Sequence, residues 1–305
     1  MAAMLQRRLL ESALSLAFLL VAVFILARLT GDPSALYLPE TATDEMRAEF
    51  ARQKGFDQPI WQQFFTYLGE LVRFEFGDSL RQQRPALNAV LEAYPATLQL
   101  VLWTILAAVA TGVLVGCLAS LRPGSPLDRT LVGITVTGAS IPDFWLALMG
   151  ILVFAIWLGW LPTSGMATPV HWVLPVTVLM LRPAGSIAQV VRGSMISTLA
   201  SPYVKAARGR GLPLVRIVFF HALRNAAIPV ITLVGVQTAS ILNGAVIVET
   251  IFAFPGIGRL MINSILDRDF AVVQASVVLI AVAIFTLNIL IDLLYGWVDP
   301  RVRTH

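Results

Sequence analysis

Residues Pro202–Pro229 form a basic stretch in an otherwise apolar chain and read PYVKAARGRGLPLVRIVFFHALRNAAIP. This basic stretch has five Lys or Arg residues and no Asp or Glu, and long apolar runs flank it on both sides. The run Tyr203–Arg210 favours a short helix, which Gly211 and Pro213 should end. A second run has apolar residues at helical spacing, namely Val215, Val218, Phe219 and Leu223. The charge alone would also fit a loop that only orients a membrane protein.

The composition is that of an integral membrane protein. Of the 305 residues, 57% are hydrophobic and only 13% are charged, whereas about a quarter of a typical soluble domain is charged. Apolar runs of about 20 residues can cross a bilayer as helices, and these runs do not alternate as the strands of a membrane barrel do. The net charge of +4 resides largely on one set of loops. Membrane topology therefore explains it without a nucleic-acid partner.

Six apolar runs predict six transmembrane helices in an all-α fold. They cover about Leu9–Leu29, Thr97–Leu121, Leu131–Trp160, Trp172–Val191, Ile228–Val248 and Ala271–Tyr295. Pro142 interrupts the third run. Basic residues fall on alternate sides of successive runs, at Arg7 and Arg8, Arg122 and Arg129, the basic stretch, and Arg301 and Arg303. Because cytoplasmic loops carry an excess of Lys and Arg, we expect both termini and the basic stretch on the cytoplasmic face.

The chain is expected to have four parts. Residues 1–30 contain the N-terminus and the first transmembrane helix, and residues 31–96 form a helical insert outside the cell membrane. Residues 97–299 form the transmembrane core, which includes the basic stretch 202–229, and residues 300–305 form a cytoplasmic tail. In the insert, Thr43 should cap a helix that runs through Lys54 and ends at Gly55.

Two further helices are expected in the insert. Pro59 suits the first turn of one of them. Its apolar face comprises Ile60, Trp61, Phe64, Phe65, Leu68, Leu71 and Val72. That face would lie on the membrane surface or, as we favour, pack on the rest of the insert. The other is a short helix from Pro85 to Tyr94.

The motifs of several enzyme classes are absent. The phosphate-binding pattern GxxxxGK[ST] does not occur, so another chain must hydrolyse any ATP. No HExxH occurs, and His171, His221 and His305 are far apart, which argues against a metal site. Gly138-Ala139-Ser140 is similar to the serine motif of intramembrane proteases, but the chain lacks a membrane-embedded histidine as base. We therefore expect no catalytic residue, and small residues here favour close helix packing.

Polar residues within the apolar runs are candidates for a solute path. Asp143 follows Pro142, and Gln237 and Asn243 lie in the fifth run. Pro142 frees a backbone carbonyl, which only protein or a water-filled cavity can satisfy in a membrane. These residues form interhelical hydrogen bonds or line a translocation path. The predicted path comprises Ser140, Pro142, Asp143, Gln237 and Asn243.

Short motifs along nearly the whole chain resemble one transporter family. They are Asp57–Trp61, Phe76–Leu80, Tyr94–Leu98, Ser140–Trp145, Leu158–Pro162, Glu249–Phe252 with Pro255-Gly256, and Asp299–Arg301. In order and spacing they resemble the permease subunits of bacterial ABC importers, specifically the first permease of the dipeptide/oligopeptide/nickel group. Members of this group carry dipeptides, oligopeptides, nickel complexes, glutathione or opine-like compounds. The resemblance implies a multi-pass subunit of the bacterial cytoplasmic (inner) membrane, which forms half of a path for peptides.

The same resemblance implies that the basic stretch holds the coupling loop that binds an ATPase. Ala206, Ala207 and Gly211 match the family pattern, whereas Lys205 replaces its glutamate. The ATPase-coupling residues would be Tyr203, Lys205, Ala206, Ala207, Arg208, Gly209, Arg210 and Gly211. The residues of the external gate, or of the face towards the binding protein, would be Glu249, Phe252, Pro255 and Gly256.

The implied partners are a second homologous permease, two ATPase subunits that bind the ATP and Mg²⁺, and an external solute-binding protein. This chain itself would hold no cofactor. A channel or facilitator that needs no ATPase is the alternative outside this class. The coupling-type loop argues against it.

Overall fold

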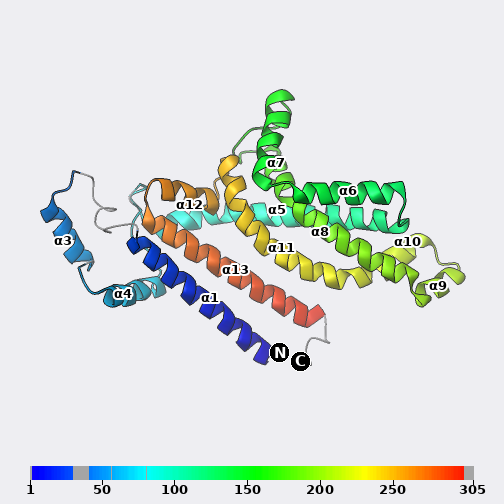
Figure 1. The fold of residues 1–305 in the computed structure, drawn as a ribbon, viewed down its shortest axis with the longest axis horizontal. Coiled ribbons are helices and arrows are strands. Elements are labelled where there is room, and N and C mark those ends of the chain that lie inside the picture. The colour runs from blue at the N-terminus through cyan, green and yellow to red at the C-terminus, as the bar shows by residue number, and fades with distance from the viewer. Residues whose placement is uncertain (1, 30–40, 56, 80, 299–305) are drawn as a thin grey trace. The chain divides into compact units, whose positions relative to one another are not determined.

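The structure is a computed structural model that describes residues 2–29, 41–55, 57–79 and 81–298 (Figure 1). Within these ranges every regular element is helical. The elements are α1 (Ala2–Leu29), α3 (Asp44–Lys54), α4 (Ile60–Val72), α5 (Ala86–Leu121), α6 (Pro126–Ser140), α7 (Asp143–Gly150), η1 (Ile151–Trp157), η2 (Pro169–Trp172), α8 (Val173–Ala200), α9 (Pro202–Gly209), α10 (Leu214–Arg216), η3 (Ile217–Ala222), α11 (Leu223–Ile251), α12 (Ile257–Leu266) and α13 (Phe270–Val298). The predicted tail 300–305, the Asp299–Arg301 motif and residues 31–40 of the insert lie outside the described residues.

Within the described residues, four helices are long and apolar enough to cross a membrane. They are Ala86–Leu121, Pro169–Ala200, Pro229–Ile251 and Phe270–Ile291. The pair α6 and α7–η1 makes a fifth if the two are one broken span. The described apolar part of α1, Ala13–Ala22, is too short to meet the same length test. The prediction of an all-helical membrane protein is confirmed, and the sixth span stays a prediction.

The third predicted span is broken rather than merely interrupted. The helix Pro126–Ser140 and the helical segment Asp143–Trp157 are bent by 101° relative to each other, and Figure 1 shows α7 turned away from α6. Ile141 and Pro142 between them have extended backbones, with ψ of 134° and 138°. A proline disfavours the helical conformation of the residue before it, so that Ile141 ends α6. As a result Asp143 begins a new helix.

The chain divides into two compact units. One comprises Ala96–Pro255 together with α13 from Leu287, and the other comprises Ala2–Pro95 with Gly256–Thr286. In the first unit α5, α8, η3 and α11 share a core that includes Ile187, Val191 and Met195.

Two glycines four residues apart allow α5 to lie directly against α8. A Cβ atom on Gly112 would be 2.8 Å from the Ala184 carbonyl oxygen, and one on Gly116 would be 2.6 Å from that of Ala188. Both distances are shorter than real Cβ contacts, so any larger residue would push the helices apart. Neither glycine was predicted to have this role, although their spacing of four is the signal of a close helix approach.

The insert belongs to the second unit and is partly as predicted. Thr43 caps α3 by accepting a hydrogen bond from the Met46 amide (3.3 Å), and Gly55 ends it with a φ of 69°, which confirms both boundaries. The predicted separate helix Pro85–Tyr94 is wrong, because α5 runs without a break from Ala86 through Pro95. Pro95 therefore lies inside α5, where it removes one backbone hydrogen bond without ending the helix.

The apolar face of α4 is only half covered. Phe64 and Tyr67 pack against Phe24 of α1, with ring centroids 5.2 and 5.5 Å away. Ile60, Trp61, Phe65 and Val72 remain exposed. The favoured packing on the rest of the insert holds for Leu71, which packs against a cluster that includes Phe76, Ala86 and Val90. Phe64 and Tyr67 instead contact α1, which is outside the insert, and the other four residues stay exposed.

Candidate functional site

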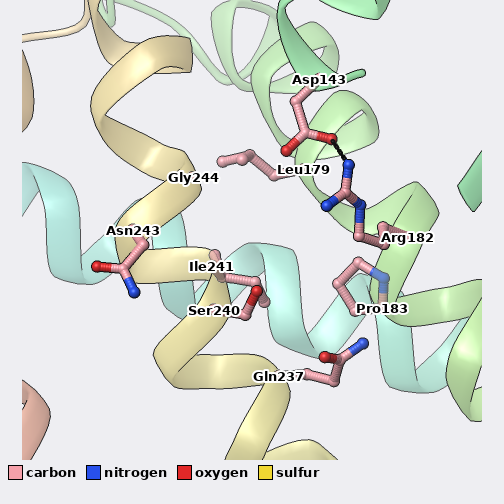
Figure 2. Close-up of a pocket in the computed structure, with 9 residues that line it drawn as sticks. All are labelled: Asp143, Leu179, Arg182, Pro183, Gln237, Ser240, Ile241, Asn243 and Gly244. Atoms are coloured by element: carbon pink, nitrogen blue, oxygen red, sulfur yellow. Dashed lines mark ion pairs between the residues drawn. The ribbon is translucent and has the colours of Figure 1, made fainter. Parts of the chain in front are cut away.

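A polar cavity of about 280 Å³ lies among α7, α8 and α11 of the first unit (Figure 2). Its lining residues are Asp143, Leu179, Arg182, Pro183, Gln237, Ser240, Ile241, Asn243 and Gly244. Three of the five residues predicted for the translocation path are in this set, namely Asp143, Gln237 and Asn243. They come from runs about 100 residues apart, and the tertiary fold brings them together.

Asp143 and Arg182 lie next to each other in the wall of the cavity as a loose ion pair (Figure 2). A nitrogen of the Arg182 guanidinium is 3.7 Å from Asp143 Oδ1, which is longer than a hydrogen bond. The exposed fraction of the side chain is 24% for Asp143 and 51% for Arg182. The break at Pro142 puts Asp143 in the first turn of α7, where the helix dipole stabilises a negative charge.

The α11 side of the cavity presents neutral polar groups. Gln237, Ser240 and Gly244 follow one another at helical spacing of three and four, so they share one face of α11. A Cβ atom on Gly244 would be 3.5 Å from Asp143 Oδ2, which shows how closely the α11 backbone approaches the carboxylate. The Gln237 side chain extends beside Pro183, whereas the Asn243 amide points away from the ion pair (Figure 2).

Ser140 and Pro142 are not among the cavity-lining residues. The Ser140 hydroxyl donates to the Val136 carbonyl oxygen within its own helix (2.8 Å). His171 contacts Thr168 through Nδ1 (2.8 Å), so Ser140 and His171 are not arranged as nucleophile and base. In the described part of the chain, no group of three or more His, Cys, Asp or Glu side chains is placed to hold a metal ion.

Arg182 is a cavity residue that was not predicted from the sequence. It lies in the middle of the apolar run Trp172–Val191, where a cation is costly unless it meets an anion or water. That position could have identified Arg182 as a functional candidate from the sequence. Its partner could not be predicted, because Asp143 lies on another helix.

The predicted surface helix of the basic stretch is present as α9, with nearly the predicted boundaries. Pro202 occupies the first turn, Arg210 follows the last helical residue, and Gly211 has a φ of 77°. Val204 is buried, and the residues exposed around it are Tyr203, Lys205, Ala206, Arg208, Gly209, Arg210 and Gly211, with Ala207 half-buried. The exposed face of α9 therefore carries the cations.

Two kinds of contact connect α9 to the rest of the basic stretch. The Asn225 side-chain amide in α11 donates to the Tyr203 hydroxyl oxygen (2.7 Å). The amides of Gly211 and Leu212 donate to the carbonyl oxygens of Arg208 and Ala207 (2.9 and 3.2 Å), which closes a tight turn. The left-handed backbone at Gly211 makes that turn possible.

The second run of the basic stretch differs from its predicted register. Val218 is buried as expected, but Val215 and Phe219 are 68% and 60% exposed, and Ile217 and Ala222 are buried instead. The reason is a π-helical segment, η3, between α10 and α11. Hydrogen bonds from residue i to i+5 widen each turn, so the buried face no longer follows a spacing of three and four.

The predicted external gate residues are mostly buried. Glu249 has no exposed surface, and its Oε1 accepts a hydrogen bond from the Thr97 hydroxyl (2.7 Å). Phe252 is buried as well, and its carbonyl oxygen accepts from the Gly165 amide (2.9 Å). Gly256 is buried and Pro255 is exposed. Of these four residues only Pro255 presents a side chain that a partner could contact in this conformation.

Asp128 and Arg192 form a second ion pair, which was likewise not predicted. Arg192 donates from Nε to Oδ1 (2.6 Å) and from a terminal nitrogen to Oδ2 (2.8 Å). The Gly124 amide donates to the same Oδ2 (2.8 Å). With its side chain 3% exposed, Asp128 is fully engaged and structural.

Comparison with known proteins gives a consistent result. Residues 112–304 match the family described as "Binding-protein-dependent transport system inner membrane component". The chain is 37% identical to the "Di/tripeptide transport system permease protein DppB" of Pseudomonas aeruginosa (strain UCBPP-PA14), over 92% of each chain. It is 34% identical to the "Glutathione transport system permease protein GsiC" of Escherichia coli (strain K12), over 97% of each chain.

Two solved structures share the fold. One is a membrane transporter described as "Inward facing conformations of the MetNI methionine ABC transporter", with a TM-score of 0.59 and 18% identity. The alignment covers 69% of this chain and 96% of that chain. The other is described as "Crystal structure of an amino acid ABC transporter with histidines", with a TM-score of 0.54 and 18% identity over 68% and 94% of the two chains.

Proposed function

The chain belongs to the family of binding-protein-dependent transport system inner membrane components, the permeases of bacterial ABC importers, and on this premise we propose that it imports short peptides. The observation that carries the proposal is the 37% identity, over 92% of each chain, with a permease named for di- and tripeptides. The polar cavity supports it, because its opposite charges and amide groups suit a polar solute. We infer that this chain forms half of the translocation path.

The proposed assembly contains several other protein chains. A second homologous permease would complete the path, and two ATPase subunits would bind ATP and Mg²⁺. An external binding protein would deliver the peptide. The lack of a phosphate-binding loop in this chain supports separate ATPases. We further propose six spans with both termini in the cytoplasm, and the insert, residues 31–96, on the external side of the membrane.

We assign ATPase coupling to the exposed face of α9. A short surface helix can dock in a groove of a partner, and the cations Lys205, Arg208 and Arg210 suit an acidic groove. Movement of α9 would pass to α11 through the Tyr203–Asn225 hydrogen bond and the turn at Gly211. Because α11 also carries Gln237 and Ser240, closure of the ATPases would reshape the cavity as a rigid-body movement.

Purification of the tagged chain from its native membrane tests the proposal. We expect ATPase subunits to co-purify, and proteoliposomes that contain the complex and its binding protein to take up dipeptides only with ATP. Uptake that survives without ATP, in a preparation free of ATPase, would instead establish the facilitator. Absence of peptide uptake by a complex that hydrolyses ATP would refute the peptide assignment and leave the transporter class intact.

A further inference from the structure

We propose that Asp143 and Arg182 bind the two charged termini of a short peptide, the guanidinium taking the α-carboxylate and the carboxylate taking the α-ammonium. The inference rests on the proposed function and names the chemical class of its substrate: zwitterionic peptides with both termini free. No covalent step is involved. The ion pair between the two side chains opens, and each side chain forms an ion pair with one terminus of the peptide.

The ion pair in the cavity is loose, unlike a structural ion pair in the same chain. Asp128 and Arg192 form two hydrogen bonds of 2.6 and 2.8 Å, and the aspartate side chain is 3% exposed. Asp143 and Arg182 approach only to 3.7 Å and leave 24% and 51% of their side chains exposed. A guanidinium has five N–H donors, and a contact of this length satisfies none of them well. Both charged groups are therefore available to a ligand.

The surroundings of the pair suit a short polar solute. The cavity of about 280 Å³ is near the lower end of the range of about 300–1,000 Å³ for small-molecule sites. Gln237 and Ser240 both donate and accept hydrogen bonds, as the peptide bond of such a solute requires. The cavity therefore offers one partner for each polar group of a dipeptide backbone.

Exchange of the pair for a peptide is energetically balanced. Binding of a zwitterion replaces one ion pair by two, so neither protein charge is left unpaired in the free or in the bound state. A peptide with a blocked terminus leaves one protein charge without a partner, which makes its binding unfavourable. On release the pair closes again, which keeps the affinity moderate, as transport requires.

The test measures protection of the cavity directly and needs no binding protein. Asn243→Cys, at a cavity-lining residue that has no role in the proposed site, is introduced with Cys117→Ser. Maleimide labelling of the purified complex is then followed with three ligands: a dipeptide with free termini, its C-terminal amide and its N-acetyl form. At one ligand concentration we expect the free dipeptide to slow labelling about tenfold and each blocked form to slow it less than about twofold. The reason is that a blocked form lacks one charged hydrogen bond, which lowers its affinity about tenfold or more.

Variants assign each terminus. In Arg182→Gln, which lacks the partner of the α-carboxylate, the free dipeptide and its C-terminal amide should protect equally. In Asp143→Asn, which lacks the partner of the α-ammonium, the free dipeptide and its N-acetyl form should protect equally. Arg122→Gln, which removes an exposed cation outside the cavity, should keep the wild-type discrimination. If Arg182→Gln does not assemble, Arg182→Lys is measured, and a smaller preference for the free dipeptide over the amide is expected.

Equal protection by free and blocked dipeptides, or none by any of them, would overturn the site. Discrimination that is unchanged in Arg182→Gln, or in the substitute Arg182→Lys, would do the same. Peptide uptake is measured separately, on the same complex in proteoliposomes supplied with its binding protein and ATP. Protection without uptake would refute the proposed function while the site stands, and uptake without protection would refute the site alone.

Discussion

Arg192 of α8 holds Asp128 of α6 by two parallel hydrogen bonds, one to each carboxylate oxygen. The Gly124 amide shares Oδ2, so the loop between α5 and α6 is fixed to α8 at the same point. Ten residues after Arg192, the surface helix α9 begins. The pair thus fixes α8, the helix that precedes the proposed ATPase-docking helix α9. The cavity pair Asp143–Arg182, in contrast, forms no close hydrogen bond.

Removal of one partner of the closed pair should destabilise the protein. In Arg192→Gln the Asp128 carboxylate would lose its counter-charge and two hydrogen bonds, and we expect the stability to fall. The unfolding midpoint of the purified complex measures it. The double variant Asp128→Asn with Arg192→Gln should lose less than Arg192→Gln alone, because no charge is then left unpaired. A larger loss in the double variant would contradict a structural role for the pair.

The turn after α9 should tolerate asparagine and not valine at Gly211. Its φ of 77° is in the left-handed region, and a Cβ atom there would meet nothing within 4 Å, so the cost is conformational and not steric. Gly211→Val should cost about 1–3 kcal/mol of backbone strain and uncouple ATP hydrolysis from uptake, while the complex still assembles in part. Gly211→Asn, the matched control, should remain coupled. Normal uptake by the valine variant would remove the role assigned to this turn.

The hydrogen bond between Tyr203 and Asn225 should contribute to coupling. Tyr203→Phe keeps the ring and removes the oxygen that accepts from the Asn225 amide (2.7 Å). We expect more ATP to be hydrolysed per peptide transported, with a stability loss of only about 0.5–1.5 kcal/mol. The ratio of the two rates in proteoliposomes measures the effect. An unchanged ratio would show that movement reaches α11 by another contact.

The close approach of α5 and α8 should make Gly116 sensitive to one added methyl group. A Cβ atom there would lie 2.6 Å from the Ala188 carbonyl oxygen, so Gly116→Ala should destabilise by about 1–3 kcal/mol. Gly133→Ala is the control, since a Cβ atom on Gly133 meets nothing within 4 Å. Equal unfolding midpoints for the two variants would mean that the helices separate at no cost.

The buried hydroxyl of Tyr67 should make stability depend on high pH. Burial raises the pKa of Tyr67 to about 12, and its hydroxyl oxygen has no hydrogen-bond partner among the described residues. Because the folded protein holds this proton more tightly than the unfolded chain, stability should fall between about pH 10, the ordinary tyrosine value, and pH 12. Tyr67→Phe should flatten that fall and leave stability at pH 7 unchanged or raised. An identical pH profile for both proteins would contradict the assignment.

Local sequence was sufficient for several features of this protein. The apolar composition determined a helical membrane protein, Thr43 and Gly55 determined the ends of α3, and Pro202 and Gly211 those of α9. Each depends on residues within one or two turns, where capping, proline and glycine act directly on the backbone. The motif order was likewise enough to predict the family, which the match of residues 112–304 confirmed.

Other features depend on residues distant in the chain, and only the tertiary structure decided them. Asp143 is the partner of Arg182 because the chain turns by 101° at Pro142. The turn places Asp143, the first residue of α7, next to Arg182 of α8. Glu249, which the resemblance assigned to the external gate, is buried and accepts a hydrogen bond from Thr97, 152 residues earlier in the chain. The basic stretch itself kept its predicted first helix and lost the predicted face of its second run to a π-helical turn. Periodicity in sequence states which residues share a face, but packing determines what that face meets and whether the period itself is kept.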